Sequence, residues 1–435
     1  MALSIFPTLT YFILFNALVL LIPGLQLKGF KKPVSIFVLN LKFLAGFTLW
    51  FIYTFYYTDT ANNDVYKFYK DAVTLHEIRQ ESHSAFWKLM TGANNEETNS
   101  YTPRLQNWKR NFDEAPVNEN QTVIRFNALL IFISGRIYFV HILIMCFISY
   151  MAYLLIANAL ATHLKGKNPV LILLPLLLPS VLLWTAGVMK EPLMMLGIAF
   201  LFCGLAGLYS AIVRCTLFAI GIALLLAVKF YVLVCLLPAG LIYLVAKRLN
   251  NFKQVSSAYL CGYAVLAALA FNLNYFSSIN PTQMLVNKQQ HAVKEAEYFN
   301  AGSIISVPQI NANAISIVKA CPHALYNTLT QPSLFNAGKP IVIFNALENL
   351  LVLLLLPYLL VKIQRNRLSN LNLVLFLLSA TLSYFILIGI STPVAGNLVR
   401  YKAPLLPLFI YAFILLSDLP EWPFANRFLL QKSSD

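Results

Sequence analysis

The feature that most constrains the fold of this chain is a series of apolar runs that recurs along almost its whole length. In lipid only helices and closed barrels satisfy all their backbone polar groups, and a helix needs about 20 apolar residues to cross the bilayer. Eleven runs approach or reach that length: 9–27, 36–57, 137–160, 169–188, 193–212, 215–228, 230–246, 256–275, 340–361, 370–391 and 403–418. They predict an all-α polytopic membrane protein with about 11 transmembrane helices, built as a single integral membrane domain over residues 1–435.

The exact number of spans depends on how the region 215–246 folds. Lys229 separates the runs 215–228 and 230–246, and each run is short for a complete crossing. Two spans, one bent helix and a re-entrant hairpin are all compatible with this pattern, and the sequence leaves the three alternatives open.

The composition excludes several classes of protein. Hydrophobic residues make up 59% of the chain and charged residues only 11%, whereas a soluble domain carries about 25% charged residues. A disordered chain, a collagen and a small disulfide-rich scaffold are therefore excluded. The net charge of +15 alone would suit a nucleic-acid partner, but apolar runs interrupt the basic residues everywhere. We therefore expect a lipid bilayer and no nucleic acid as the partner.

The short loops that follow alternate runs are basic and contain no acid, which predicts the orientation of the chain. Lysine and arginine are retained on the cytoplasmic side of membranes. The basic residues of these loops are Lys28, Lys31, Lys32, Lys165, Lys167, Arg214, Lys247, Arg248, Lys253, Lys362, Arg365 and Arg367. With eleven crossings, this pattern places the N-terminus outside and the C-terminus in the cytoplasm.

Two long polar segments, 58–125 and 276–338, fall on the opposite side and are predicted to be large extracytoplasmic loops. The first contains aromatic and charged residues at helical spacing around 65–69 and 85–90, which predicts short amphipathic helices at the membrane interface. Within it, the stretch 91–122 is dense in Asn, Glu, Pro and Gln, which favours a polar loop.

Ionisable residues gather at the predicted outer ends of several helices. They are Asp59, Asp64, Arg125, Arg136, Lys190, Glu191, Lys229, Arg400 and Lys402, with Tyr401 between the last two. Charge at a membrane boundary is costly, and basic residues on the outer side run against the positive-inside rule. Snorkelling of single side chains explains any one of them without a function. The whole set is better explained by a substrate-binding site.

The chemistry of this set suits a phosphate-bearing substrate. Arginine and lysine form charge-assisted hydrogen bonds with phosphate, and a carboxylate can accept a proton. At the edge of a bilayer the natural phosphate is one linked to a lipid. We predict Asp59 or Asp64 as the general base that deprotonates an incoming sugar hydroxyl, and Arg400 as the phosphate ligand.

Supporting roles fall to the remaining members of the set. Lys190 and Lys229 would assist Arg400, and Arg125 or Arg136 would contact the acceptor or a diphosphate. Asp59, Asp64 and Glu191 could offer hard oxygen ligands to a divalent metal, although no residue spacing demands a metal or any other cofactor.

Glu348 is a separate candidate, because it lies well inside the apolar run 340–361. An isolated acid there would cost several kcal/mol or be protonated. We expect Glu348 to pair with a basic residue or to face a polar cavity, and structural pairing and substrate contact are equally compatible with its position.

The chain resembles the bacterial integral-membrane glycosyltransferases of the GT-C type. The resemblance covers most of the chain as layout and is carried by three short elements: the acidic stretch from Asp59 to Asp64, the stretch from Pro179 to Pro192 that contains Lys190-Glu191, and the stretch from Asn397 to Pro404 that contains Arg400-Tyr401. It implies a polyprenyl-phosphate-linked sugar donor, a glycan or lipid acceptor, and a place in the bacterial inner membrane. In such enzymes the late Arg-Tyr element lies near the lipid phosphate.

The chain departs from that family in one respect: its acidic loop follows the second predicted span, whereas the family places it after the first. Wzy-like polysaccharide polymerases, which carry two large outer loops with essential arginines, are therefore an alternative resemblance. A transporter or flippase of a lipid-linked or anionic substrate is a second alternative, although the chain shows no internal repeat of the kind that many transporters contain. A structural or assembly role without a site is the last.

Overall fold

The computed structural model describes residues 2–57, 64–93, 95–109, 118–164, 170–249, 251–336, 338–363, 370–419 and 428–430. Every regular element in these ranges is a helix, and the only β-type pairings among them are isolated bridges. The prediction of an all-α protein is confirmed for this part of the chain.

Seven helices in the described residues are long and apolar enough to cross a membrane. They are α1 (Ala2–Leu21), α2 (Lys32–Phe51) with its π-helical continuation Ile52–Tyr56, α7 (Tyr138–Ala161), α11 (Ala211–Ala246), α12 (Phe252–Asn272) with the turn Leu273–Tyr275, α15 (Pro340–Val361) and α16 (Leu371–Ser391). An eighth span arises if α17 (Ala395–Lys402) and α18 (Leu406–Leu416), which meet at 57°, form one broken crossing. These helices indicate a multi-pass membrane protein.

In the described residues the predicted number of eleven spans is not confirmed, because three apolar runs do not each form one long helix and the runs 215–228 and 230–246 both lie in α11. The run 169–188 is divided into α8 (Val170–Leu173), a 3₁₀ turn (Leu174–Leu177) and α9 (Pro179–Trp184). Proline lacks the amide hydrogen that a continuing helix needs, and Pro175 and Pro179 lie at these divisions.

The other two runs end early. The run 193–212 corresponds to α10 (Glu191–Ala206), which has 16 residues and ends at Gly207 with a left-handed φ of 84°. The run 403–418 contributes only the 11 residues of α18.

The region 215–246 lies in α11, which consists of two helical segments joined at a kink, and the three alternatives that the sequence left open remain predictions. Lys229 has φ −156° and ψ 78°, far from helical values, and the helix continues on both sides of it. The bend therefore lies at the one ionisable residue between the two apolar runs.

The chain divides into two compact units, which we describe separately. Unit 1 contains residues 1–159, 182–230 and 429–435, and unit 2 contains residues 160–181 and 231–428.

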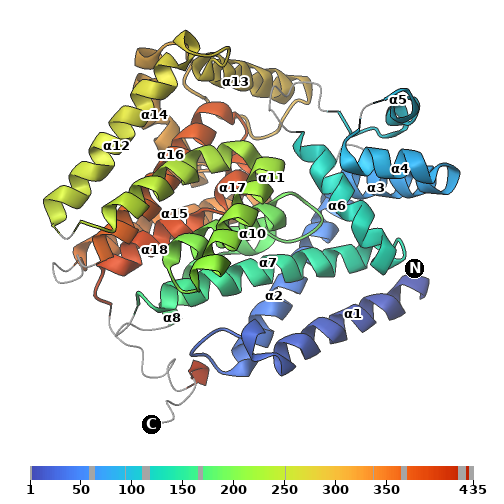
Figure 1. Cartoon of the computed structure of the whole chain (residues 1–435). Coiled ribbons are helices and arrows are strands. Elements are labelled where there is room, and N and C mark those ends of the chain that lie inside the picture. The colour runs from blue at the N-terminus through green and yellow to red at the C-terminus, as the bar shows by residue number, and fades with distance from the viewer. Residues whose placement is uncertain are drawn as a thin grey trace. The chain divides into compact units, whose positions relative to one another are not determined.

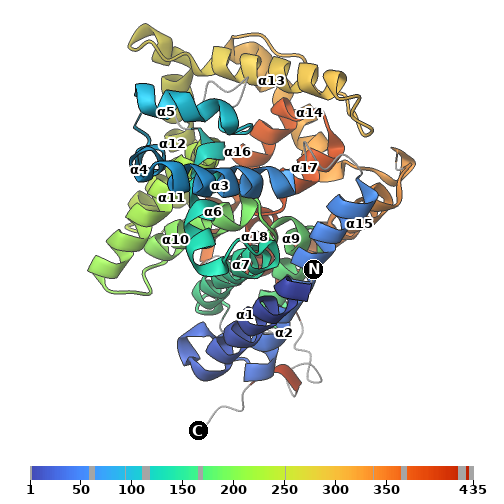
Figure 2. The ribbon, with the colours of Figure 1, turned by 90° about the vertical axis from the view of Figure 1, so that its right-hand side faces the viewer.

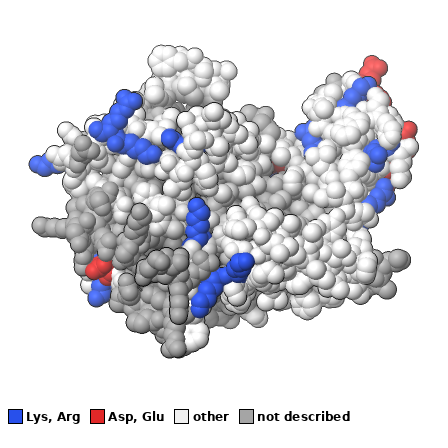
Figure 3. All heavy atoms as spheres, turned by 60° about the horizontal axis from the view of Figure 1, so that its bottom comes forward, with Lys and Arg blue, Asp and Glu red and all other residues white. Residues whose placement is uncertain are grey.

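In unit 1 the polar segment after α2 folds into helices. They are α3 (Asp64–Glu81), α4 (His83–Thr91), α5 (Glu96–Tyr101) and α6 (Glu119–Ser134), and α3 packs against both α4 and α6 (Figures 1 and 2). The helices predicted around 65–69 and 85–90 are present as α3 and α4. Acidic and basic side chains share the surface of this lobe (Figure 3), as its mixed charge predicts.

Capping explains where two of these helices begin. The Ser82 side chain accepts a hydrogen bond from the Ala85 amide at the start of α4. Asn95 and Thr98 form a reciprocal capping box at the start of α5. This box makes a helix inside the stretch 91–122, where the polar composition alone favoured a loop.

In unit 2 the helix α16 is the common packing partner. It contacts α12, α13 (Pro281–Tyr298), α14 (Ala314–Thr330), α17 and α18. The buried amide of Gln289 on α13 donates to the carbonyl oxygens of Pro308 at 2.8 Å and Ile390 at 2.7 Å. These bonds fasten the polar segment 276–338 to the apolar helix α16.

His76 on α3 should make the stability of the protein depend on pH. It is buried, and its Nε2 lies 2.8 Å from the Ala128 carbonyl oxygen. Burial lowers the pKa of His76 below its ordinary value of 6.5, the hydrogen bond opposes this, and the charges of Arg79 and Arg136 lower the pKa further. The stabilisation from neutral His76 is therefore present above pH 6.5 and is lost as the pH falls through the folded-state pKa.

We expect the apparent Tm to fall between about pH 7.5 and about pH 5, and to fall less in His76→Gln, whose amide can still donate to Ala128. Burial raises the pKa of Asp71, which lies on the same helix. The effect of Asp71 on stability therefore runs opposite to that of His76 as the pH falls, and it is the same in both proteins. The difference in slope between the two proteins thus isolates His76. Equal slopes would contradict the prediction.

Candidate functional site

The most concentrated group of buried charges lies in unit 1, where three separate segments meet. Glu119 is the first residue of α6, Lys190 occupies the N-cap position of α10, and Lys229 is the residue at which α11 bends. Each residue therefore stands at the start or at a break of a helix. We refer to Glu119, Lys190 and Lys229 as the Glu119 cluster.

The Glu119 cluster is held by short ionic contacts. The Lys190 ammonium lies 2.7 Å from Glu119 Oε1, and the Lys229 ammonium lies 3.3 Å from Glu119 Oε2. The three side chains are between 5% and 8% exposed. Lys190 also lies 5.3 Å from the centre of the Phe68 ring, at cation–π distance. Burial weakens solvent screening, so each ionic contact here is stronger than it would be at a surface.

Glu191 follows Lys190 directly and is fully buried in the first turn of α10. The N-terminus of a helix carries partial positive charge, which favours a carboxylate at this place. The sequence Lys190-Glu191 therefore places opposite charges at the start of one buried helix.

In unit 2 a second group of buried polar residues surrounds Lys402 at the end of α17. The Lys402 ammonium donates to Asn349 Oδ1 at 2.7 Å and to the Thr328 carbonyl oxygen at 3.1 Å. Asn349 in turn donates to the Pro332 carbonyl oxygen at 3.1 Å. We refer to Lys402, Asn349 and Thr328 as the Lys402 cluster. It joins α14, α15 and α17 through hydrogen bonds to buried groups.

Glu348 is buried and directly precedes Asn349 of this cluster in the sequence. Its hydrogen-bond donor is Ser180. Its Oε2 accepts a hydrogen bond of 2.6 Å from the Ser180 amide, and its Oε1 accepts one from the Ser180 hydroxyl. The expectation that Glu348 pairs with a basic residue is met in part, because Glu348 interacts electrostatically with Lys402, while its hydrogen bonds come from Ser180 at the start of α9. Two donors from one residue therefore supplement the interaction of this carboxylate with Lys402.

Arg400 and Tyr401 lie on α17, with Arg400 buried and Tyr401 half-buried. The Tyr384 hydroxyl donates to the Tyr401 carbonyl oxygen at 2.9 Å, and the Tyr384 ring stacks on Tyr231. The segment that carries Arg400 and Lys402 is thus fixed to α16 as well as to α14.

Arg125 has a packing role in the structure. Its Nε donates to the Leu89 carbonyl oxygen at 2.9 Å, and its guanidinium lies 5.0 Å from the centre of the Trp108 ring. Burial lowers the pKa of Arg125. Arg125 therefore holds α4 against α6.

Arg136 lies in the turn between α6 and α7. It is exposed, has a left-handed φ of 63°, and accepts a hydrogen bond at its carbonyl oxygen from the Tyr69 hydroxyl. This position leaves the Arg136 side chain available at the surface of unit 1.

The structure therefore brings together only part of the predicted set. Lys190 and Lys229 meet in unit 1, while Arg400, Tyr401, Lys402 and Glu348 belong to unit 2. Asp59 lies outside the described residues, and Asp64 begins α3 but its side chain lies outside them too. The prediction of these two residues as catalytic remains a prediction.

Sequence reasoning missed Glu119, the carboxylate on which the unit 1 cluster depends. Glu119 ends a polar stretch that contains several other acids, and no local signal distinguishes it. It also missed Lys42, which is fully buried in α2 and donates to the Leu182 carbonyl oxygen at 3.0 Å and to the Thr185 hydroxyl. A lysine inside the apolar run 36–57 was a usable signal, because such a residue is costly in lipid.

Two further observations bear on the identity of the site. Within the described residues, no group of three or more His, Cys, Asp and Glu is placed to hold a metal ion, while Asp59 and the Asp64 side chain, two of the three predicted ligands, lie outside them. No protein-family model, curated protein or solved structure matches the chain.

Proposed function

We propose that this protein is a membrane glycosyltransferase that moves a sugar from a polyprenyl-phosphate-linked donor to a glycan or lipid acceptor. It would act on the extracytoplasmic face of a bacterial inner membrane, with the N-terminus outside and the C-terminus in the cytoplasm. The observation that carries the proposal is the Glu119 cluster, in which two lysines and a glutamate are buried together at the ends and breaks of helices.

Burial of three ionisable groups demands a reason, because each costs several kcal/mol to remove from water. Purely structural needs are met more cheaply by apolar side chains of similar volume. A site for an anionic substrate supplies the reason, since ammonium groups held in place by a carboxylate are already oriented for a phosphate and lose little entropy on binding.

The proposed roles follow from this assignment. Lys190 and Lys229 bind and neutralise the phosphate that leaves with the lipid carrier, and Glu119 positions their ammonium groups. Asp59 or Asp64 removes the proton from the acceptor hydroxyl as the new glycosidic bond forms at the sugar carbon and the bond to the carrier phosphate breaks. Arg136 contacts the acceptor in this proposal, and Arg400 of unit 2 keeps the separately predicted role of a phosphate ligand.

One observation favours a transporter or flippase as a second candidate. The helix α11 bends at a buried lysine, and α17 meets α18 at 57° beside Lys402. Broken helices with charges at the break are typical of substrate sites in transporters.

A Wzy-like polymerase differs from the main proposal in its dependence on arginines in place of carboxylates.

Complementation of a deletion strain tests the proposal. We expect Asp59→Asn combined with Asp64→Asn, and separately Lys190→Met, to abolish the surface glycan and to accumulate carrier-linked sugar on the outer leaflet. Lys190→Arg should retain part of the activity, and Lys88→Met, which breaks only an exposed ion pair with Glu97, should behave as wild type. Each variant is first shown to be present in the membrane at the wild-type level.

The alternatives give different results in the same experiment. Loss confined to Arg125, Arg136 and Arg400 variants would indicate a polymerase, and accumulation on the inner leaflet would indicate a flippase. An unchanged lipid profile in both the carboxylate and Lys190 variants would contradict the proposed transferase.

A further inference from the structure

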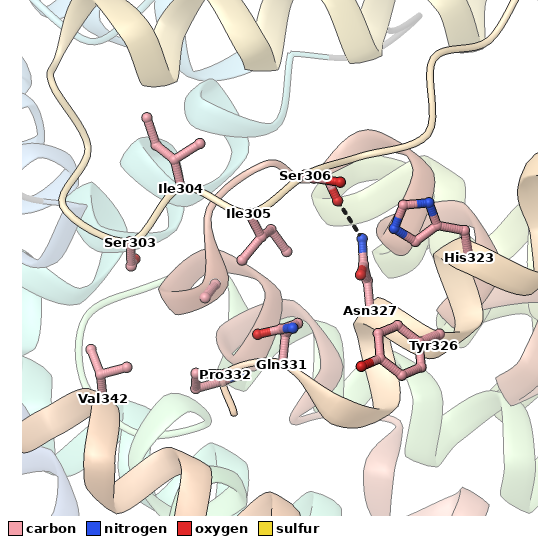
Figure 4. Close-up of a pocket in the computed structure, with 11 residues that line it drawn as sticks. Ser303, Ile304, Ile305, Ser306, His323, Tyr326, Asn327, Gln331, Pro332 and Val342 are labelled. Carbon is pink, nitrogen blue, oxygen red and sulfur yellow. Dashed lines mark hydrogen bonds between the residues drawn. The ribbon is translucent and has the colours of Figure 1, made fainter. Parts of the chain in front are cut away.

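Unit 2 contains a pocket that none of the predicted site residues lines. It has a volume of about 320 Å³ and lies between the segment 303–306, one face of α14, the start of α15 and the start of α17. Figure 4 shows His323 and Asn327 of α14 beside Ser306 of the segment 303–306, with Tyr326 next to Asn327. This volume is at the lower end of the range of small-molecule sites, which matches one or two sugar rings rather than a lipid chain.

Hydrogen bonds fix the wall formed by the segment 303–306. The Asn327 side chain donates to the Ser306 carbonyl oxygen at 2.7 Å (Figure 4). The Ile305 amide donates to the Pro393 carbonyl oxygen at 2.8 Å, and the Ala395 amide donates to the Ser303 carbonyl oxygen at 2.9 Å. A wall anchored on both sides is pre-formed, so a ligand would not have to order it on binding.

The lining offers neutral polar groups and no formal charge from Asp, Glu, Lys or Arg. Two serine hydroxyls, the His323 imidazole, the Tyr326 phenol and the Gln331 amide can each donate and accept hydrogen bonds. The Tyr326 ring is 58% exposed and supplies a flat apolar face. A phosphate would find no lysine or arginine among these groups, whereas a polyhydroxylated ring would find many hydrogen-bond partners.

The pocket is connected to the Lys402 cluster through shared elements. Ala395 of the pocket begins the same eight-residue helix that carries Arg400 and Lys402. At about 1.5 Å per residue, Arg400 stands only about 7.5 Å along the axis from Ala395. Thr328, whose carbonyl oxygen binds Lys402, follows Asn327 directly. A neutral group in the pocket and an anionic group near α17 could therefore belong to one substrate.

A lysine also stands at the rim of the pocket. Gly302 precedes the segment 303–306, and the Lys339 ammonium lies 2.9 Å from the position that a Cβ on Gly302 would occupy. A Cβ at this position would require the flexible end of the Lys339 side chain to move. The pocket thus has a neutral interior and a basic rim.

We propose that this pocket binds a neutral sugar ring of the substrate, with Tyr326 stacking on the ring and the serine, histidine and glutamine side chains binding its hydroxyls. The proposal rests on the proposed function, because it names the part of the substrate that unit 2 would recognise. The sugar can belong to the donor or to the acceptor, and both present the same chemistry.

Saturation-transfer NMR on the purified full-length protein in detergent tests this proposal. The probes are the methyl glycosides of glucose, galactose, N-acetylglucosamine and rhamnose. We expect saturation transfer to at least one glycoside, and binding weakened about threefold or more in Tyr326→Ala through loss of the ring contact. Val342→Trp, which places a large side chain in the pocket, should abolish binding.

Tyr298→Ala is the matched control, because Tyr298 is an 80% exposed tyrosine of unit 2 that does not line the pocket. Absence of transfer to every glycoside on the wild-type protein would overturn the proposal. So would unchanged binding in both Tyr326→Ala and Val342→Trp. Competition by a lipid-linked sugar but not by a free oligosaccharide acceptor would assign the pocket to the donor, and the reverse result would assign it to the acceptor.

This experiment separates the pocket from the transfer reaction, because it measures binding alone. If glycoside binding depends on Tyr326 but the Lys190 and Asp59/Asp64 variants make a normal glycan, the protein binds sugar and is not a transferase. If those variants lose the glycan but no glycoside binds to the wild-type protein, the transferase proposal is supported and the sugar-binding role of the pocket is contradicted.

Discussion

Replacement of Glu119 by Gln is expected to destabilise unit 1 by about 3–5 kcal/mol, the cost of breaking a buried ion pair from one side. Glu119 holds the ammonium groups of Lys190 and Lys229, and all three side chains are at most 8% exposed. Glutamine has almost the same shape as glutamate but no negative charge. Both lysines therefore stay buried and lose the attraction of the Glu119 carboxylate. The loss is therefore electrostatic rather than a loss of packing.

The free energy of unfolding can be measured by titration with SDS in mixed micelles, followed by tryptophan fluorescence. Glu97→Gln is the matched control, since Glu97 makes an ion pair of 2.6 Å with Lys88 but both side chains are about a third or more exposed. Solvent screens such a pair and side-chain entropy opposes it, so we expect little change in that variant.

A triple variant distinguishes an ionic effect from a general loss of fit. Glu119→Gln, Lys190→Met and Lys229→Met together remove all three charges, and buried ion pairs replaced by apolar residues often lose no stability. We expect the triple variant to be more stable than Glu119→Gln alone, which is a non-additive result. A triple variant that is less stable than every single one would contradict the electrostatic account.

Replacement of Gly389 by Ala is expected to separate α14 from α16 and to cost about 1–3 kcal/mol. A Cβ at Gly389 would lie closer to the Ala324 backbone oxygen than any real contact allows, and 2.6 Å from the Thr328 hydroxyl oxygen. A backbone oxygen inside a helix cannot turn aside as a side chain can. Alanine favours a helix by about 1 kcal/mol over glycine, which offsets only part of this cost.

Gly396→Ala is the control for Gly389→Ala, because it makes the same change inside a helix with its nearest neighbour at 3.9 Å. We expect it to leave stability unchanged or to raise it slightly. Gly389→Ala should also weaken glycoside binding, since α14 carries His323, Tyr326 and Asn327. An unchanged free energy of unfolding in Gly389→Ala would show that the two helices do not approach as closely as the structure has them.

Hydropathy in the sequence was enough to predict most of the membrane helices. The runs 340–361 and 370–391 correspond almost residue for residue to α15 and α16. Lipid contact depends on the composition of a segment and not on its partners, so a local signal is sufficient. The number of spans was harder to predict, because Pro175, Pro179 and the backbone angles of Lys229 divide or join helices without changing their hydropathy.

The candidate site could be predicted only in part. Lys190 and Lys229 stood out because charge beside an apolar run is rare and costly. Arg125 stood out for the same reason, yet it packs on Trp108 and binds the Leu89 carbonyl oxygen. A sequence pattern shows that a charge needs a partner, but it does not show whether the partner is a substrate or a neighbouring helix.

The sequence by itself determined that this protein is a helical membrane protein with two polar segments, because apolar length and charge are properties of single segments. Only the tertiary structure decided that Glu119 is the partner of Lys190 and Lys229, and that the segment 303–306 closes a neutral pocket against α14. These pairings join residues that are far apart along the chain. Their selection depends on which buried donors and acceptors come within hydrogen-bonding distance once the helices have packed.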